Sequence, residues 1–75
     1  MSSLIVLSGK ELCKILMKLG YEIDHQTGSH LILRQNIYPN RRLTVPNHKE
    51  IAKGTLRKII RDAGLTLDEF NDLLD

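Results

Sequence analysis

The sequence predicts an α+β fold in which helices pack on one face of a three-stranded antiparallel sheet, in the order α-β-β-β-α with a short extra C-terminal helix. Apolar residues recur at helical spacing near both ends of the chain, and three alternating stretches with short connections lie between them. A sheet with one apolar face and helices with matching apolar stripes form two layers. A chain of 75 residues has material for one hydrophobic core, so we expect a single domain over residues 1–75.

The first helix is predicted over residues 9–19. Ser8 and Glu11 have the spacing of a capping box, in which each side chain accepts a hydrogen bond from the backbone amide of the other residue. An apolar face follows at positions i, i+3, i+4 and i+7, formed by Leu12, Ile15, Leu16 and Leu19. Gly20 suits the left-handed conformation in which many helices end.

The first strand is predicted over residues 21–26, followed by a turn at 27–29. Its alternation places Tyr21, Ile23 and His25 on one side. We therefore expect His25 to be a partly buried strand residue rather than a ligand-binding one.

Two further strands are predicted over residues 30–35 and 41–45, separated by a loop with a Pro-Asn turn. Their inward positions are apolar, namely Leu31, Leu33, Leu43 and Val45. Because successive side chains point to opposite faces, His30 and Arg34 are expected on the face away from the core. Pro46 ends the third strand.

Two helices complete the chain. Lys53 opens the first of them, with Gly54 and Thr55 as candidate cap residues. Its apolar stripe consists of Leu56, Ile59, Ile60 and Ala63. The last helix lies within residues 66–75, starts with a second capping box at 66–69 and is acidic.

The net charge of +2 hides a strong asymmetry along the chain. Eight Lys and Arg against one Glu give residues 25–61 a charge of +7, whereas five acidic and no basic residues give residues 62–75 a charge of −5. A basic block favours a polyanionic partner, but a solvated basic face balanced by the acidic helix would have the same composition.

Cys13 is the single cysteine, so we expect neither an internal disulfide nor a cysteine-based zinc site. The histidines lack the spacing of a zinc site, and we expect no metal and no cofactor. The apolar run at residues 4–7 is shorter than the roughly 20 residues of a membrane span or the roughly 7–15 of a signal-peptide core. A cytoplasmic location is expected.

The histidines of the basic block are the candidates for proton transfer, because imidazole gives or takes a proton near neutral pH. His30 follows Gly28 and Ser29, whose backbone amides and hydroxyl are expected to approach a phosphate. The alternative is a surface histidine after an ordinary hairpin turn. His48, at the exit of the third strand, is either a second acid–base group or a residue that fixes its loop by a hydrogen bond.

Basic side chains from the strands and the second main helix are the candidates for phosphate binding: Arg34, Arg41, Arg42, Lys53 and Arg57. They would hold RNA phosphates or dock an acidic protein. Aromatic residues are few, and Tyr21 and Phe70 suit the core, which leaves Tyr38 as the one free candidate for base stacking. Contact through phosphates and shape is therefore favoured over base stacking on the sheet.

Five segments, taken in their order and spacing, make the chain resemble the HicA toxin family over about residues 8–65: 8–12, 19–21, 28–30, 45–48 and 53–59. The resemblance implies a fold like that of double-stranded-RNA-binding domains and the activity of an mRNA interferase of a type II toxin–antitoxin system. It also implies that His30 is the catalytic histidine and that a HicB-type antitoxin binds the protein and masks its site. The loop at 36–40 is longer and more apolar than the family pattern, and the acidic last helix extends beyond it.

These observations predict a metal-independent endoribonuclease in which His30 acts as general acid or base and the basic side chains position the RNA backbone. Two alternatives stay open at this point. One is a non-catalytic double-stranded-RNA-binding module with the same basic surface, and the other is a basic protein-interaction domain with an acidic partner.

Overall fold

The computed structural model describes residues 5–74, and its elements follow the predicted order. They are α1 (Gly9–Met17), β1 (Tyr21–Thr27), β2 (His30–Gln35), β3 (Arg42–Pro46), α2 (Lys53–Asp62) and α3 (Leu67–Asp72). Leu4 of the apolar run and Asp75 of the acidic tail lie outside the described residues. Within residues 5–74, no helix is both long enough and apolar enough to cross a membrane.

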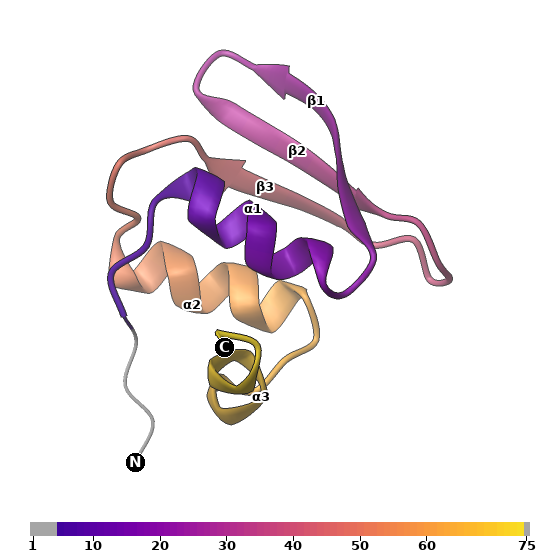
Figure 1. Ribbon diagram of the computed structural model, residues 1–75. Coiled ribbons are helices and arrows are strands. Elements are labelled where there is room, and N and C mark those ends of the chain that lie inside the picture. Colours follow the sequence, from indigo (N-terminus) through magenta and orange to yellow (C-terminus); the bar gives the residue numbers. More distant parts are fainter. Residues whose placement is uncertain (1–4, 75) are drawn as a thin grey trace.

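The strands form one antiparallel sheet in the order β1-β2-β3, and the helices lie on one of its faces (Figure 1). α1 packs against β1 and β3, α2 packs against β3, and α3 packs against α2. This arrangement confirms the predicted α+β fold with helices on one face of a three-stranded sheet. The opposite face of the sheet, called the outer face below, carries no helix in Figure 1.

The core lies between the sheet and the helices. Side chains that are at most 1% exposed come from every element: Leu12, Leu16, Tyr21, Leu33, Val45, Leu56 and Phe70. The four predicted inward positions of β2 and β3 are all buried. Full burial of one such aliphatic side chain stabilises a fold by about 1.5–3 kcal/mol. These alternating positions therefore determine which face of the sheet packs against the helices and which faces away from the core.

Both predicted capping boxes are present. At the start of α1, the Glu11 amide donates to the Ser8 hydroxyl at 3.1 Å, and the Ser8 amide donates to the Glu11 carboxylate at 2.9 Å. Thr66 caps α3 in the same way. The α1 helix ends at Met17, two residues earlier than predicted, because the next amides bond to carbonyls three residues back, which is the tighter 3₁₀ pattern.

The predicted start of α2 at Lys53 is confirmed, but the predicted cap residues were wrong. Gly54 and Thr55 do not cap this helix, because it begins at Lys53 and its N-cap is Ala52, whose side chain makes no capping hydrogen bond. The Leu56 amide donates to the Ala52 carbonyl oxygen at 2.9 Å and closes the first turn ahead of the apolar stripe. Gly54 and Thr55 therefore lie inside the first turn.

A β-bulge at Asp24 also corrects the prediction for β1. Ile23 pairs with Leu33, but the next paired residue is His25, which lies opposite Ile32. An extra residue in one strand reverses the facing of every residue that follows it. His25 is therefore exposed on the outer face and is not the partly buried residue that simple alternation predicts.

Candidate active site

His30 is the first residue of β2 and directly follows a two-residue hairpin loop made by Gly28 and Ser29. Gly28 has a φ of +55°, and Ser29 is not among the residues with positive φ, which is the pattern of a type II′ hairpin turn. His30 pairs with Thr27 on one side and with Pro46 on the other, and its side chain is exposed. Gly28 therefore supports His30 only indirectly, because its positive φ allows the turn that places His30 at the start of β2.

A pocket of about 380 Å³ contains both His30 and His48, and we call it the histidine pocket. Its remaining lining residues are Thr44, Pro46, Ala52 and Thr55. The Asn47 amide donates to the Ser29 carbonyl oxygen at 2.6 Å, which continues the β2–β3 ladder one residue beyond Pro46. Because Pro46 and His48 are two positions apart, they lie on the same side of this extended strand, which is the side of His30.

Hydrogen bonds to the N-terminal end of α1 hold the loop that carries His48. The Gly9 amide donates to the His48 carbonyl oxygen at 2.9 Å, and the Ile51 amide donates to the Leu7 carbonyl oxygen at 2.8 Å. A Cβ atom at position 9 would collide with the Pro46 carbonyl oxygen, so only glycine allows this close approach. The loop is therefore fixed at two points, by the first residue of α1 and by Leu7, which lies just before the helix.

The first turn of α2 forms one wall of the histidine pocket, where Ala52 and Thr55 line it. The first amides of a helix have no partner within the helix, and the positive end of the helix dipole favours anions. Lys53 and Arg57 are each two residues from Thr55, so they point to nearly the opposite side of α2. Lys58, three residues after Thr55, shares its side and bonds to the Asp62 carboxylate at 2.7 Å.

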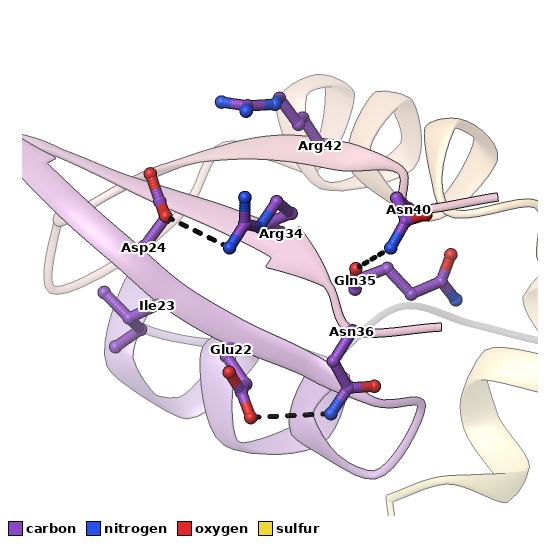
Figure 2. A pocket seen from close by; sticks show the side chains of 8 residues that line it. All are labelled: Glu22, Ile23, Asp24, Arg34, Gln35, Asn36, Asn40 and Arg42. Atoms are coloured by element: carbon purple, nitrogen blue, oxygen red, sulfur yellow. Dashed lines mark hydrogen bonds and ion pairs between the residues drawn. The ribbon is translucent and has the colours of Figure 1, made fainter. Parts of the chain in front are cut away.

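A second hollow of about 470 Å³ lies on the outer face near the other end of β2, and we call it the arginine pocket (Figure 2). Its lining residues are Glu22, Ile23, Asp24, Arg34, Gln35, Asn36, Asn40 and Arg42. Arg34 and Arg42 are cross-strand partners, and two like charges in opposite positions destabilise a sheet unless a counter-charge is near. Arg34 is four residues from His30 along β2, or about 13 Å at the usual rise of a strand.

Two carboxylates, of Glu22 and Asp24, also line the arginine pocket, so its formal charge is balanced, but within residues 5–74 only Asp24 pairs with one of the two guanidinium groups. Asp24 accepts a hydrogen bond from His25 Nδ1 at 2.7 Å and lies 3.9 Å from Arg34 Nη2. The hydrogen bond from His25, together with the charges of Arg34 and Arg42, holds the pKa of Asp24 below its usual value. Among residues 5–74, Arg42 makes no ion pair. An exposed pair as long as Arg34 and Asp24 contributes little and leaves Arg34 available to a ligand.

Arg41, a predicted phosphate-binding residue, lies apart from both pockets. Its guanidinium group occupies the space beside Gly64, where a Cβ atom would otherwise be. Gly64 follows the C-terminal end of α2 with a φ of +80°, and a cation near a helix C-terminus is favourable. Arg41 also lies close enough to Tyr21 to oppose, with its charge, the rise in the pKa of Tyr21 that burial causes. The structure therefore separates Arg41 from Arg34 and Arg42.

The other predicted site residues, Tyr38, Gly28 and Ser29, line neither the histidine pocket nor the arginine pocket. Tyr38 is 91% exposed in the loop between β2 and β3, as expected for a free aromatic side chain. Gly28 and Ser29 precede His30 in the hairpin turn.

Sequence reasoning missed Thr44 as a site residue, although its position between the inward residues of β3 already directs it to the outer face. Among the described residues, no group of three or more His, Cys, Asp or Glu side chains is arranged to hold a metal ion.

Comparison with known proteins assigns the chain to a family. A family model for the HicA toxin of bacterial toxin–antitoxin systems matches residues 9–65, which is most of the chain. A search of curated proteins finds no match. The matched range includes both pockets and the turn before His30. The chain therefore belongs to the HicA toxin family.

Proposed function

We propose that this toxin is an mRNA interferase that cleaves RNA phosphodiesters with His30 as a proton-transfer group. The observation that carries the proposal is the position of His30: an exposed imidazole in a pocket whose wall is the first turn of α2. Free amides and the dipole at a helix N-terminus favour a phosphate, and the imidazole beside them can move a proton. Membership of the HicA toxin family supports the same function.

The chemistry follows from the residues that line the histidine pocket. The 2′-hydroxyl of the substrate ribose attacks the adjacent phosphorus and the bond to the 5′-oxygen breaks, so one proton must leave and one must arrive. His30 acts as general acid or general base in this step, which contributes about 10²–10⁴-fold to a rate. Cleavage of this kind uses the nucleophile of the RNA itself, and we propose that it needs no metal ion.

The RNA backbone is proposed to run along the outer face from the histidine pocket to the arginine pocket. Arg34 and Arg42 present two guanidinium groups on the face that carries His30, which suits another phosphate of the same strand. Tyr38 is available for base stacking beyond them. Lys53 and Arg57 point away from Thr55, so in this proposal they contact RNA outside the histidine pocket, and Arg41 makes no phosphate contact.

The test compares the purified protein with His30→Ala on RNA in the presence of EDTA, with cleavage measured on denaturing gels. We expect the wild type to cleave and the variant to lose about 10²–10⁴-fold in rate. His25→Ala is the matched control, because His25 is also exposed on the outer face but lies outside the histidine pocket. Equal cleavage by wild type and His30→Ala would overturn the role of His30. RNA that is bound but not cut by the wild type would favour a non-catalytic double-stranded-RNA-binding module.

We also propose that a HicB-type antitoxin inhibits the protein by covering the outer face. The family model describes toxins of toxin–antitoxin systems, and one partner over that face would block the histidine and arginine pockets together. Addition of the antitoxin should stop RNA cleavage, and RNA should compete with the antitoxin for binding. Simultaneous binding of RNA and antitoxin without loss of cleavage would contradict this arrangement. Cellular mRNA as the substrate is in keeping with the predicted cytoplasmic location.

A further inference from the structure

We propose that His48 is the second proton-transfer group of this RNA cleavage, so that two histidines share the acid and base roles. The inference rests on the proposed function and adds to it a second catalytic residue. A phosphodiester transfer needs one group to take the proton of the nucleophile and another to supply a proton to the leaving oxygen. His30 alone can occupy only one of these roles at a time.

Strand register places the backbones of the two histidines near each other, on the same side of neighbouring segments. His30 lies opposite Pro46, and the bond from the Asn47 amide to the Ser29 carbonyl oxygen continues this register toward His48. Residues on one face that are offset by two positions across an antiparallel pair are about 7–8 Å apart. Such a separation suits two side chains that reach the two sides of one phosphate, and the shared pocket agrees with it.

The histidine pocket contains no other titratable side chain. Besides the two histidines, it is lined by two threonines, one proline and one alanine. Neither hydroxyl of Thr44 or Thr55 titrates near neutral pH, and they serve instead as hydrogen-bond partners for phosphate oxygens. His48 is therefore the one lining residue that can complete an acid–base pair with His30.

The backbone at His48 is also held in place, as a proton-transfer group requires. Its carbonyl oxygen accepts from the Gly9 amide at 2.9 Å, and Pro46, two residues earlier, packs against Gly9. The side chain of His48 is exposed, so these constraints act on its backbone while the imidazole stays accessible to a substrate. Such support from a helix terminus positions the backbone that carries the imidazole before the substrate binds.

The proposed step balances as follows. One imidazole accepts the proton of the ribose 2′-hydroxyl while the 2′-oxygen forms a bond to phosphorus. The bond between phosphorus and the 5′-oxygen breaks, and the other imidazole, in its protonated form, gives its proton to that oxygen. The products are a 2′,3′-cyclic phosphate and a 5′-hydroxyl, and the two histidines have exchanged protonation states, which water reverses before the next turnover.

The first experiment measures cleavage of an RNA oligonucleotide by His48→Ala, His30→Ala and the control His25→Ala under single-turnover conditions. We expect His48→Ala to lose about 10²–10⁴-fold in rate, as His30→Ala does, and the control to cleave at the wild-type rate. Thermal unfolding of each variant, together with the RNA dissociation constant, separates loss of chemistry from loss of fold or binding. His48→Asn, which keeps a polar side chain without a titratable group, should be as impaired as His48→Ala.

A second substrate distinguishes proton transfer from a merely structural role. It carries sulfur in place of the bridging 5′-oxygen at the cleaved bond, and the thiolate that leaves needs no proton. The variant that lacks the general acid should regain cleavage on this substrate, whereas the variant that lacks the general base should not. Rescue of either His48→Ala or His30→Ala, but not of both, supports the pair and assigns the two roles.

Two results would overturn the inference while leaving the proposed function intact. One is cleavage of ordinary RNA by His48→Ala at the wild-type rate while His30→Ala is inactive. The other is an impaired His48→Ala with neither variant rescued by the sulfur substrate, which would make His48 a structural residue. Failure of the proposed function itself has a different signature, namely a wild-type protein that leaves RNA intact or a fully active His30→Ala.

Discussion

The backbone amide of Gly9 donates a hydrogen bond to the carbonyl oxygen of His48 at 2.9 Å, across 39 positions of the sequence. This bond uses one of the amides at the start of α1 that have no partner within the helix. It joins the helix layer to the loop that follows β3 and holds one wall of the histidine pocket. The absence of a side chain at Gly9 is what lets Pro46 approach. The geometry of the site therefore depends on a residue that does not line it.

We predict that Gly9→Ala destabilises the protein and impairs its activity. A Cβ atom at position 9 would collide with the Pro46 carbonyl oxygen, and relief of such overpacking costs about 1–3 kcal/mol. Gly54→Ala is the matched control, since a Cβ atom there meets nothing within 4 Å and alanine favours helix. Urea unfolding should show a lower free energy of unfolding for Gly9→Ala alone. Equal stability of the two variants would show that Pro46 shifts without cost.

Arg41 and Arg42 are predicted to have separate roles although they are adjacent. Loss of the Arg41 guanidinium from the C-terminal end of α2 should lower the free energy of unfolding by about 0.3–1 kcal/mol in Arg41→Ala and leave RNA affinity unchanged. Arg42→Ala should lower RNA affinity and leave the free energy of unfolding unchanged. If Arg42 contacts one phosphate, the slope of log affinity against log salt should fall by about 0.7 in this variant. Equal effects of the two variants on that slope would contradict the separation.

Acid unfolding should depend on Glu11. Hydrogen bonding with the backbone amide and, to a lesser extent, the side chain of Ser8 holds the pKa of Glu11 below the usual 4.5. Because the pKa is lower in the folded state, the stabilisation by the ionised carboxylate is present above about pH 4.5 and is lost as the pH falls through the folded-state pKa. Glu11→Gln keeps an acceptor but no charge, so its deficit in stability should be seen near neutral pH and vanish in acid. A deficit that is independent of pH between neutral and acid would contradict this assignment.

The thiol of Cys13 is predicted to be unreactive in the folded protein. It is 2% exposed, and burial raises its pKa to about 11, so little thiolate exists near neutral pH. The rate of labelling by a thiol reagent should be far below that of a free cysteine and should rise with urea as the protein unfolds. Labelling of the folded protein at the rate of a small thiol would contradict the burial. Cys13→Ala should accordingly retain RNA cleavage.

Local patterns account for the parts of the fold that were predicted well. The capping boxes at Ser8 and Thr66 involve contacts only three residues apart, so their geometry depends on local sequence. The alternation of Leu31 and Leu33 is equally local, and it places His30 on the outer face. These features were confirmed because no distant part of the chain is needed to form them.

Three features could not be predicted in this way. The bulge at Asp24 reverses the facing of His25, and nothing in the alternation of β1 marks an inserted residue. α2 begins at Lys53 as predicted, but its N-cap Ala52 has no capping side chain, so local sequence pointed wrongly to Gly54 and Thr55 as caps. Alternation puts Arg41 on the inward side with Leu43 and Val45, but it does not show that the guanidinium meets Gly64, which is 23 positions away.

By itself, the sequence determined the order of helices and strands, the inward face of β2 and β3, and the outward position of His30. Those properties follow from periodicity and from contacts within one turn or one hairpin. Only the tertiary structure decided that His48 joins His30 in one pocket, that Arg34 faces Arg42, and that Lys53, Arg57 and Arg41 point elsewhere. The physical reason is that strand register, the contact between Gly9 and Pro46 and the rotation of α2 about its axis are settled by packing between distant segments, and local patterns do not encode them.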